Sequence, residues 1–166
     1  MRFLEAPVSD PTAERLLTEY FTGREETFPS AQGTYRTSFP VPEQFVPPAG
    51  QFLLVLDGDG DGPLDPGAAV GCGGIRRIAD TAAGEVRYEV KHLFLRPAAR
   101  GRGAGKLLLR ELESRAAAFG ADLVVLDTNA SLEAAGGLYR SSGYVDIEPF
   151  NDNPNATNWY EKRLGG

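Results

Sequence analysis

The chain has 166 residues, of which 42% are hydrophobic, and its formal net charge is −6. This length and apolar content suit a single globular domain over residues 1–166 and exclude a disordered chain. The excess of acidic residues argues against a nucleic-acid-binding protein, which needs a contiguous basic face.

Cysteine content and the first residues bear on the cellular compartment. The single cysteine, Cys72, rules out an intrachain disulfide bond and favours a reducing compartment. The opening residues MRFLEAP lack the pattern of a secretory signal, and no apolar run is long enough to cross a membrane. We therefore expect a soluble, cytoplasmic protein with no membrane or nucleic-acid partner.

In chain order, the first expected elements are a short strand at 2–7 and a helix. Asp10-Pro11 supplies an N-cap and a first helical residue. The apolar positions of the helix are Ala13, Leu16, Leu17, Tyr20 and Phe21. The stretch 23–50 is rich in proline and has no regular period. A loop of this length in a compact domain is disordered or functional, and helical turns can be hidden in it.

The remainder of the chain alternates strand and helix patterns. Strands are expected at 51–56, 68–78, 85–95, 122–127, 144–148 and 158–164, and helices at 104–119 and 132–142. The run at 122–127 is nearly all apolar, which is typical of a strand in the middle of a parallel pair. The order β-α-β-β-β-α-β-α-β-β predicts an α/β sandwich.

The connection after the strand at 85–95 is the most informative segment. Three glycines (Gly101, Gly103 and Gly105) lie within five positions, immediately before and inside the start of the next helix. The N-terminus of a helix presents free backbone N–H groups, and glycine lets the backbone approach an anion closely. The sequence therefore predicts a turn that binds the phosphates of a cofactor.

This turn and two other runs resemble one enzyme family. RGRGAG at 100–105 fits the Arg/Gln-x-x-Gly-x-Gly/Ala pyrophosphate loop of the GNAT superfamily, the acyl-CoA-dependent N-acetyltransferases. LYRSSGY at 138–144 resembles the family's Leu-Tyr-x-x-x-Gly-Phe signature. EVKHL at 89–93 resembles the Glu-x-Lys-Arg-Leu run of a bacterial subgroup that also tends to carry an Asn-Pro, as Asn153-Pro154 does here.

The resemblance covers roughly residues 51–164 and implies a fold and a co-substrate. The implied fold is a GNAT-type α/β/α sandwich around a mixed, mostly antiparallel sheet with a central splayed parallel strand pair. Acetyl-CoA is the implied co-substrate, with no metal. The strand end, splayed by a bulge, would bind the pantetheine arm, and the turn would bind the pyrophosphate. The implied cofactor-binding residues are Leu93, Phe94, Leu95, Arg100, Gly101, Arg102, Gly103, Ala104, Gly105 and Lys106. Of these, Arg102 and Lys106 can equally be solvated charges.

Glu89 is the candidate general base. It lies eleven residues before Arg100, which is the spacing at which histone-type members of the family place their base. Such a carboxylate can accept the proton of an amine directly or through water. The alternative is a surface carboxylate that pairs with Lys91 or Arg87.

Tyr139 is the candidate general acid, because it resembles the family tyrosine whose phenol points at the CoA sulfur. The alternative is a tyrosine half-buried in the core. Many family members carry an asparagine seven residues before this tyrosine. Here that position is Leu132, and the nearest asparagine is Asn129.

Three other features receive a structural interpretation. His92, the only histidine, falls on the strand face opposite Glu89 unless a bulge rotates it, so a core or sheet-surface histidine is expected. Cys72 is expected to be buried and inert. DGDGDG at 57–62 mimics the start of an EF-hand loop, but position 12 is Ala68 and no flanking helices are indicated. We expect an acidic hairpin loop rather than a metal site.

The acceptor side is expected to form from the stretch 23–50 and the C-terminal strands. Aromatic wall residues would be Phe28, Tyr35, Phe39, Trp159 and Tyr160, and a substrate carboxylate would meet Arg24 or Arg36. The net negative charge would attract a cationic amine.

The sequence thus predicts an enzyme that moves an acetyl group from acetyl-CoA to a primary amine of a small molecule. The amine would attack directly in a ternary complex. The alternatives are a protein or peptide N-acetyltransferase, which needs an open groove, and a non-catalytic acyl-CoA-binding module. A homodimer is compatible with family habit.

Overall fold

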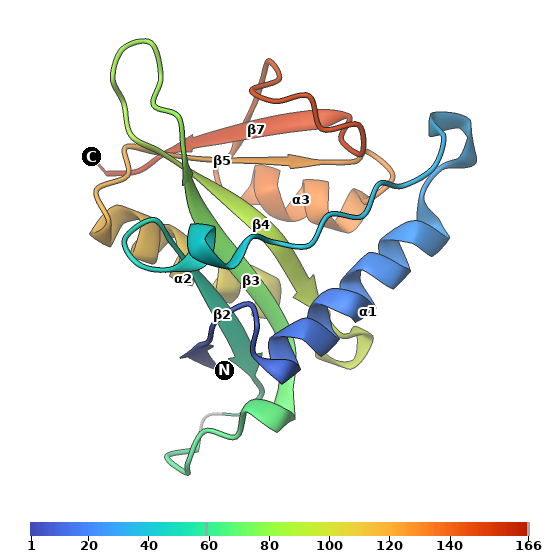
Figure 1. The fold of residues 1–166 in the computed structure, drawn as a ribbon, viewed down its shortest axis with the longest axis vertical. Coiled ribbons are helices and arrows are strands. Elements are labelled where there is room, and N and C mark those ends of the chain that lie inside the picture. Colours follow the sequence, from blue (N-terminus) through green and yellow to red (C-terminus); the bar gives the residue numbers. More distant parts are fainter. Residues whose placement is uncertain (59, 166) are drawn as a thin grey trace.

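A seven-stranded twisted sheet forms the centre of the computed structural model, which describes residues 1–58 and 60–165 (Figure 1). The strand order in the sheet is β1-β2-β3-β4-β5-β7-β6. The strands are β1 (Arg2–Glu5), β2 (Gly50–Leu56), β3 (Ala69–Ile78), β4 (Arg87–Leu95), β5 (Leu123–Thr128), β6 (Val145–Ile147) and β7 (Asn158–Arg163). Of the described strand pairs, β4 and β5 are parallel and the others antiparallel. The predicted mixed sheet with a central parallel pair is therefore confirmed.

Three helices cover the two faces of this sheet. One face carries α1 (Pro11–Thr27), and the other carries α2 (Ala104–Ala118) and α3 (Glu133–Ser141) (Figure 1). The Asp10 carboxylate caps α1 by accepting hydrogen bonds from the next turn, as the sequence predicted. Within the described part of the chain, none of these helices has the length and apolar character that a membrane-spanning segment needs.

The apolar residues form two clusters, one on each side of the sheet. The side chains of Phe52 and Leu54 on β2 pack toward α1, whereas those of Leu53 and Val55 pack toward α2. All four side chains are fully buried. A strand that is covered on both faces has no need of polar positions, which explains why the sequence of β2 is an apolar run rather than an alternating pattern.

Helix α1 is longer than the sequence predicted. The helical pattern was expected to end before Gly23, but α1 continues to Thr27. A single glycine inside a helix costs only about 1 kcal/mol relative to alanine, which a helix of 17 residues tolerates. The extension places the buried Arg24 in the last turn of α1 rather than in a loop.

The α1–β2 connection (residues 28–49) crosses in front of β4 before it enters the sheet (Figure 1). It contains two short 3-10 turns, Ser30–Gln32 and Pro42–Phe45, which are the hidden helical turns that the sequence allowed. The ring of Phe45 packs against Gly74, where an added Cβ would lie 2.8 Å from the ring carbons. Gly74 therefore allows this connection to lie close to the sheet.

Candidate active site

A β-bulge interrupts β4 at His92. Lys91 pairs with Gly74 and Phe94 with Cys72, so β4 contains one more residue than β3 between these pairs. His92 adopts the left-handed conformation with φ 56°, which is uncommon outside glycine. The bulge shifts the alternation of side chains by one position, so Leu93 packs on the α2 side of the sheet.

The bulge also places His92 on the α1 face, the face that carries Glu89. Its ring packs against Tyr20, Phe21 and Phe45, with ring centroids 5.4 to 6.1 Å apart. Burial, together with the charges of nearby cations, lowers the pKa of His92 to about 3. The imidazole is therefore neutral at physiological pH, and it forms part of the cavity wall described below.

The two parallel strands separate beyond Glu89. Pairing between β4 and β5 ends at Glu89 and Val125, although β4 continues to Leu95 and β5 to Thr128. The parallel pair is thus splayed, as the family resemblance implied. The freed edge of β4 has backbone groups without a strand partner, and Arg100 Nε donates a hydrogen bond to the Leu95 carbonyl at 2.8 Å. Arg100 therefore contacts the strand end in this structure.

The turn before α2 presents a row of unused backbone donors. Gly101 and Gly103 have φ values of 76° and 77°, which residues with a side chain adopt only with strain. Across the described residues, no acceptor receives a hydrogen bond from the N–H groups of residues 101–106. Free N–H groups at a helix N-terminus fit the pyrophosphate of a CoA molecule, and the adjoining splay fits its pantetheine arm.

The charged residues of this turn differ in their surroundings. Arg102 Nη2 lies 2.6 Å from Asp57 Oδ2, and this contact lowers the pKa of Asp57. Lys106 is exposed. Asp57 opens the aspartate-glycine loop, whose Asp59 lies outside the described residues. No cluster of metal-ligating side chains occurs in the part of the chain that the structure describes.

A cavity of about 490 Å³ opens where the strands separate. Its wall is built from α1, the α1–β2 connection, β3, β4, β5, α3 and the loops that flank β5 and β7. Four of the expected acceptor residues line it, namely Arg24, Tyr35, Arg36 and Phe39. Its volume lies in the range typical of small-molecule sites.

Tyr139 reaches this cavity from the α3 side of the sheet. Its side chain is buried, and burial raises its pKa to about 12. The charge of Asp127 raises the pKa further, whereas the charge of Arg24 opposes the rise. The phenol therefore keeps its proton at physiological pH, which a general acid requires. Leu132 lies on the same wall.

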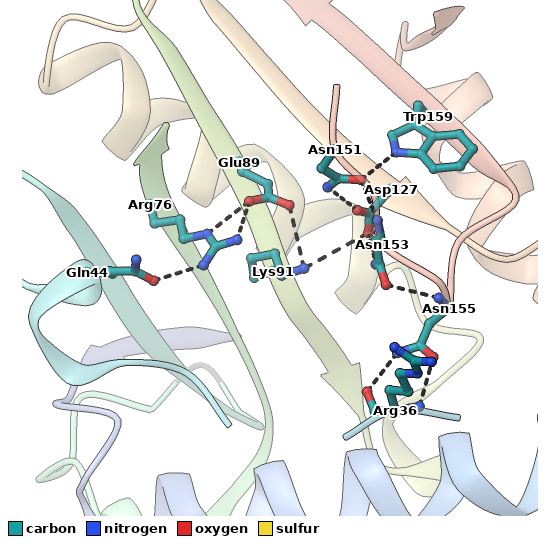
Figure 2. A network of polar contacts seen from close by, with 10 residues as sticks. All are labelled: Arg36, Gln44, Arg76, Glu89, Lys91, Asp127, Asn151, Asn153, Asn155 and Trp159. Carbon is teal, nitrogen blue, oxygen red and sulfur yellow. Dashed lines mark hydrogen bonds and ion pairs between the residues drawn. The ribbon is translucent and has the colours of Figure 1, made fainter. Parts of the chain in front are cut away.

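A chain of polar contacts runs along the α1 face of the sheet (Figure 2). Arg76 binds Glu89 Oε2 through Nε at 2.9 Å and Nη2 at 2.8 Å. Lys91 Nζ lies 3.5 Å from Glu89 Oε1 and 4.0 Å from Asp127 Oδ1. The Glu89 side chain is only 1% exposed, and Glu89 is not among the described residues that line the cavity.

Asp127 is the carboxylate of the cavity wall, and the sequence analysis did not identify it. Its side chain is 7% exposed and accepts hydrogen bonds from Asn151 at 2.7 Å and from Asn153 at 3.1 Å. Trp159 Nε1 in turn donates to Asn151 Oδ1 (Figure 2). Two features of the sequence could have pointed to Asp127. The apolar run at 123–128 ends in polar residues, and the segment 151–155 is rich in asparagine.

Asparagines also attach the α1–β2 connection to the loop before β7. Asn155 accepts a hydrogen bond from the Arg36 N–H at 2.9 Å and donates one to the Arg36 carbonyl at 2.8 Å. Asn129 Nδ2 contacts Gln32 Oε1 at 2.6 Å and the Asn155 carbonyl at 3.1 Å. These contacts join two segments of the cavity wall.

Cys72 plays no part in this wall. It is fully buried, as the sequence predicted, and burial raises the pKa of its thiol. A protonated, buried thiol is not available as an acyl-carrying nucleophile.

Comparison with known proteins identifies the family. The model of the acetyltransferase (GNAT) family matches residues 12–144. The chain belongs to the GNAT family. The residues matched by the GNAT model include the splayed strands, the glycine turn and Tyr139.

Individual relatives agree with this GNAT assignment. The chain is 39% identical over 84 residues to the IAA acetyltransferase of Azospirillum brasilense, covering 51% of this chain and 52% of the relative. It is 40% identical over 86 residues to the N-alpha-acetyltransferase RimI of Mycobacterium tuberculosis, covering 52% and 51%. The chain thus spans about half the length of these curated relatives.

Solved structures show the same fold. A GNAT superfamily phosphinothricin acetyltransferase from Sinorhizobium meliloti, solved in complex with acetyl-CoA, superposes with a TM-score of 0.62 at 20% identity. The alignment covers 99% of this chain and 90% of that one. At this identity the likeness establishes the fold.

Proposed function

We propose that the protein transfers an acetyl group from acetyl-CoA to a primary amine of a small molecule by direct attack in a ternary complex. The observation that carries this proposal is the cavity at the strand splay, which has Tyr139 on its wall. Acetyl-CoA supplies the acetyl group as an activated thioester. A cavity of about 490 Å³ lies in the size range that holds a small-molecule acceptor.

Cofactor binding is assigned to the strand end and the turn. The N–H groups of residues 101–106 bind the pyrophosphate, and the backbone of Leu93–Leu95 binds the pantetheine amides. The free donors of the turn support the first assignment, and the unpaired edge of β4 supports the second. The Arg100 contact with the Leu95 carbonyl must then open or rearrange when the pantetheine binds.

Proton transfer is assigned to Tyr139 and Glu89. The amine nitrogen forms the new C–N bond, the C–S bond breaks, and the Tyr139 phenol donates a proton to the departing sulfur. Overall, the ammonium form of the acceptor loses two protons, one of which ends on the CoA sulfur and the other in solvent. Tyr139 is suited to this step because its raised pKa keeps it protonated.

Glu89 is proposed to take the proton of the amine through water. Its Oε1 atom is buried and has no hydrogen-bond partner, which leaves a lone pair available. Direct contact with the amine is disfavoured by the 1% exposure of the side chain. Asp127, unlike Glu89, lines the cavity. Its carboxylate is the group that binds the ammonium form of the acceptor before the reaction.

The first test is a thermal-shift titration with acetyl-CoA, CoA and ATP, followed by an assay of thiol release with a panel of amines. Both CoA species should raise the melting temperature, and ATP should not, because only ligands that bind the native state stabilise it. Tyr139→Phe should bind CoA normally and lose turnover by about 10²-fold or more.

Two results would contradict the proposal. Absence of any shift with both CoA species would remove the cofactor assignment. Unchanged turnover in Tyr139→Phe would remove the acid assignment while leaving the cofactor assignment intact.

A further inference from the structure

The cavity wall is cationic, although the chain as a whole is acidic. Its charged lining residues in the described part of the chain are four cations and one acid, namely Arg24, Arg36, Arg76, Lys91 and Asp127. Arg76 and Lys91 are compensated by the carboxylates of Glu89 and Asp127. Arg24 and Arg36 remain uncompensated. The net negative charge of the chain led us to expect a site that attracts cations. The charged residues of this wall are instead mostly cationic.

Arg24 is the more informative of the two remaining cations, because Arg36 is exposed to solvent. Arg24 is only 7% exposed, and its Nη1 atom has no hydrogen-bond partner. No carboxylate of the described residues forms an ion pair with it. The guanidinium lies over the Tyr35 ring, 5.2 Å from the ring centroid. A buried charge without an ionic partner is costly, so a guanidinium kept on a cavity wall indicates an anionic ligand.

Arg24 and Asp127 act on the same part of the cavity from different elements, α1 and β5. The positive charge of Arg24 lowers the pKa values of Tyr20, Tyr35 and Tyr139, and the negative charge of Asp127 raises the pKa values of the same three tyrosines. Arg24, Asp127 and Tyr139 also line the same cavity, where the chemistry is proposed to occur. The cavity wall thus carries a buried guanidinium that no described carboxylate pairs with, Arg24, and a carboxylate, Asp127, which also lies 4.0 Å from Lys91 Nζ.

We propose that the acceptor is an amino-acid-like zwitterion, a small molecule with a carboxylate next to its primary amine. Its carboxylate binds the Arg24 guanidinium, and its ammonium group faces Asp127. This inference rests on the proposed acetyl transfer and names its substrate class. A planar guanidinium matches a carboxylate through two parallel hydrogen bonds. A peptide N-terminus has an amide in place of this carboxylate, and a simple amine has nothing there, so both leave Arg24 unpaired.

The test uses three series of compounds, each with a constant side chain. The series are phenylalanine, phenylalaninamide and phenethylamine; leucine, leucinamide and isoamylamine; and lysine, lysinamide and cadaverine. Acetylation is followed by thiol release, and binding is followed by thermal shift with saturating CoA. In each accepted series, kcat/KM for the acid should exceed that for its amide and its amine by roughly tenfold to a hundredfold, the range for a hydrogen bond to a charged group.

Variants of Arg24 assign this preference to one side chain. Arg24→Gln should remove most of the preference by raising KM for the acids, so that the ratio of kcat/KM between each acid and its amine falls toward one. Arg24→Lys should retain part of it, because the charge remains. Arg15→Gln on the outer side of α1 is the matched control and should change nothing. The thermal shift with CoA verifies that each variant is folded.

The outcomes separate this inference from the proposed function. No CoA binding would contradict the proposed function itself. CoA binding with equal turnover of acids, amides and amines, or a preference that survives in Arg24→Gln, would overturn the zwitterion and leave acetyl transfer intact. CoA binding with no turnover and no acid-induced shift in any of the three series would also overturn the zwitterion.

Discussion

Arg76 binds Glu89 through two nitrogen atoms, Nε at 2.9 Å and Nη2 at 2.8 Å, both from Oε2. This pair leaves Oε1 free of hydrogen bonds while it compensates the buried charge. The residue that the sequence suggests as the base is therefore also part of the structure that holds the sheet together. A Glu89 variant can lose activity because the base is missing or because the ion pair with Arg76 is broken. Variants of both residues are needed to distinguish these two causes.

Glu89→Gln and Asp127→Asn should change different kinetic constants. Glu89→Gln should lower kcat by about 10²-fold, because the base is lost. Asp127→Asn should mainly raise KM for the acceptor, because the group that meets the ammonium is lost. Steady-state kinetics measures both effects. If Asp127→Asn instead lowered kcat by this factor and Glu89→Gln did not, Asp127 would be the base.

Arg76→Ala tests the structural part of the same pair. Removal of the guanidinium leaves the buried Glu89 carboxylate with Lys91 as its remaining ionic partner. The free energy of unfolding should fall by about 3 kcal/mol, at the lower end of the range for a broken buried pair. Chemical denaturation measures this loss. The exposed Arg77→Ala, which removes an ion pair with Asp80, should cost less than about 1 kcal/mol.

His92 should make the protein less stable as the pH falls below neutrality. Its pKa is lowered from 6.5 to about 3 on folding, so between these values the unfolded chain binds more protons than the native protein. Stability therefore falls with decreasing pH across this window, by at most about 1.4 kcal/mol per pH unit. His92→Asn keeps a residue that tolerates positive φ and does not titrate. Denaturation at several pH values should show a shallower slope in this variant, and an unchanged slope would contradict the assignment.

Gly103 should be required for both stability and cofactor binding. At φ 77°, Gly103→Ala is strained by about 1 kcal/mol, although nothing lies within 4 Å of the added Cβ. Gly84→Ala is the matched control, since Gly84 has φ 81° and equally open surroundings far from the turn. Both variants should lose similar stability, but only Gly103→Ala should weaken CoA binding, which calorimetric titration measures. Equal CoA affinities in the two variants would argue against the turn as the pyrophosphate site.

Asn155 should control access to the acceptor side of the cavity. Its side chain makes two hydrogen bonds to the backbone of Arg36 and so attaches the α1–β2 connection to the loop before β7. Asn155→Ala should raise KM for the acceptor several-fold, with CoA affinity unchanged, because it loosens the outer wall. Asp152→Ala, in the same loop and exposed, should leave KM for the acceptor as it was. If Asn155→Ala changed only the affinity for CoA, Asn155 would act on cofactor binding and not on the acceptor side of the cavity.

The sequence predicted the parts of the molecule that depend on neighbours along the chain. The glycine turn was recognisable because Gly101, Gly103 and the helix start lie within a few residues, and backbone geometry there is a local property. The strands and helices were recognisable from apolar periodicity. The observed ends differ from the predicted ones by a few residues, most clearly in α1, which continues through Gly23 to Thr27 and includes the buried Arg24.

What the sequence did not reveal is which distant side chains meet. Asn155 and Arg36 are 119 positions apart in the chain, and Asp127 becomes a cavity carboxylate only because the asparagines of another loop fold back onto it. The bulge at His92 reverses the alternation that two-residue periodicity implies, so the face of each later side chain follows from strand pairing with β3. Local conformational preferences therefore determined the elements and the phosphate-binding turn. Packing between elements decided the cavity, its charges and the placement of Arg24 and Asp127 on one cavity wall, because these depend on contacts that no local pattern encodes.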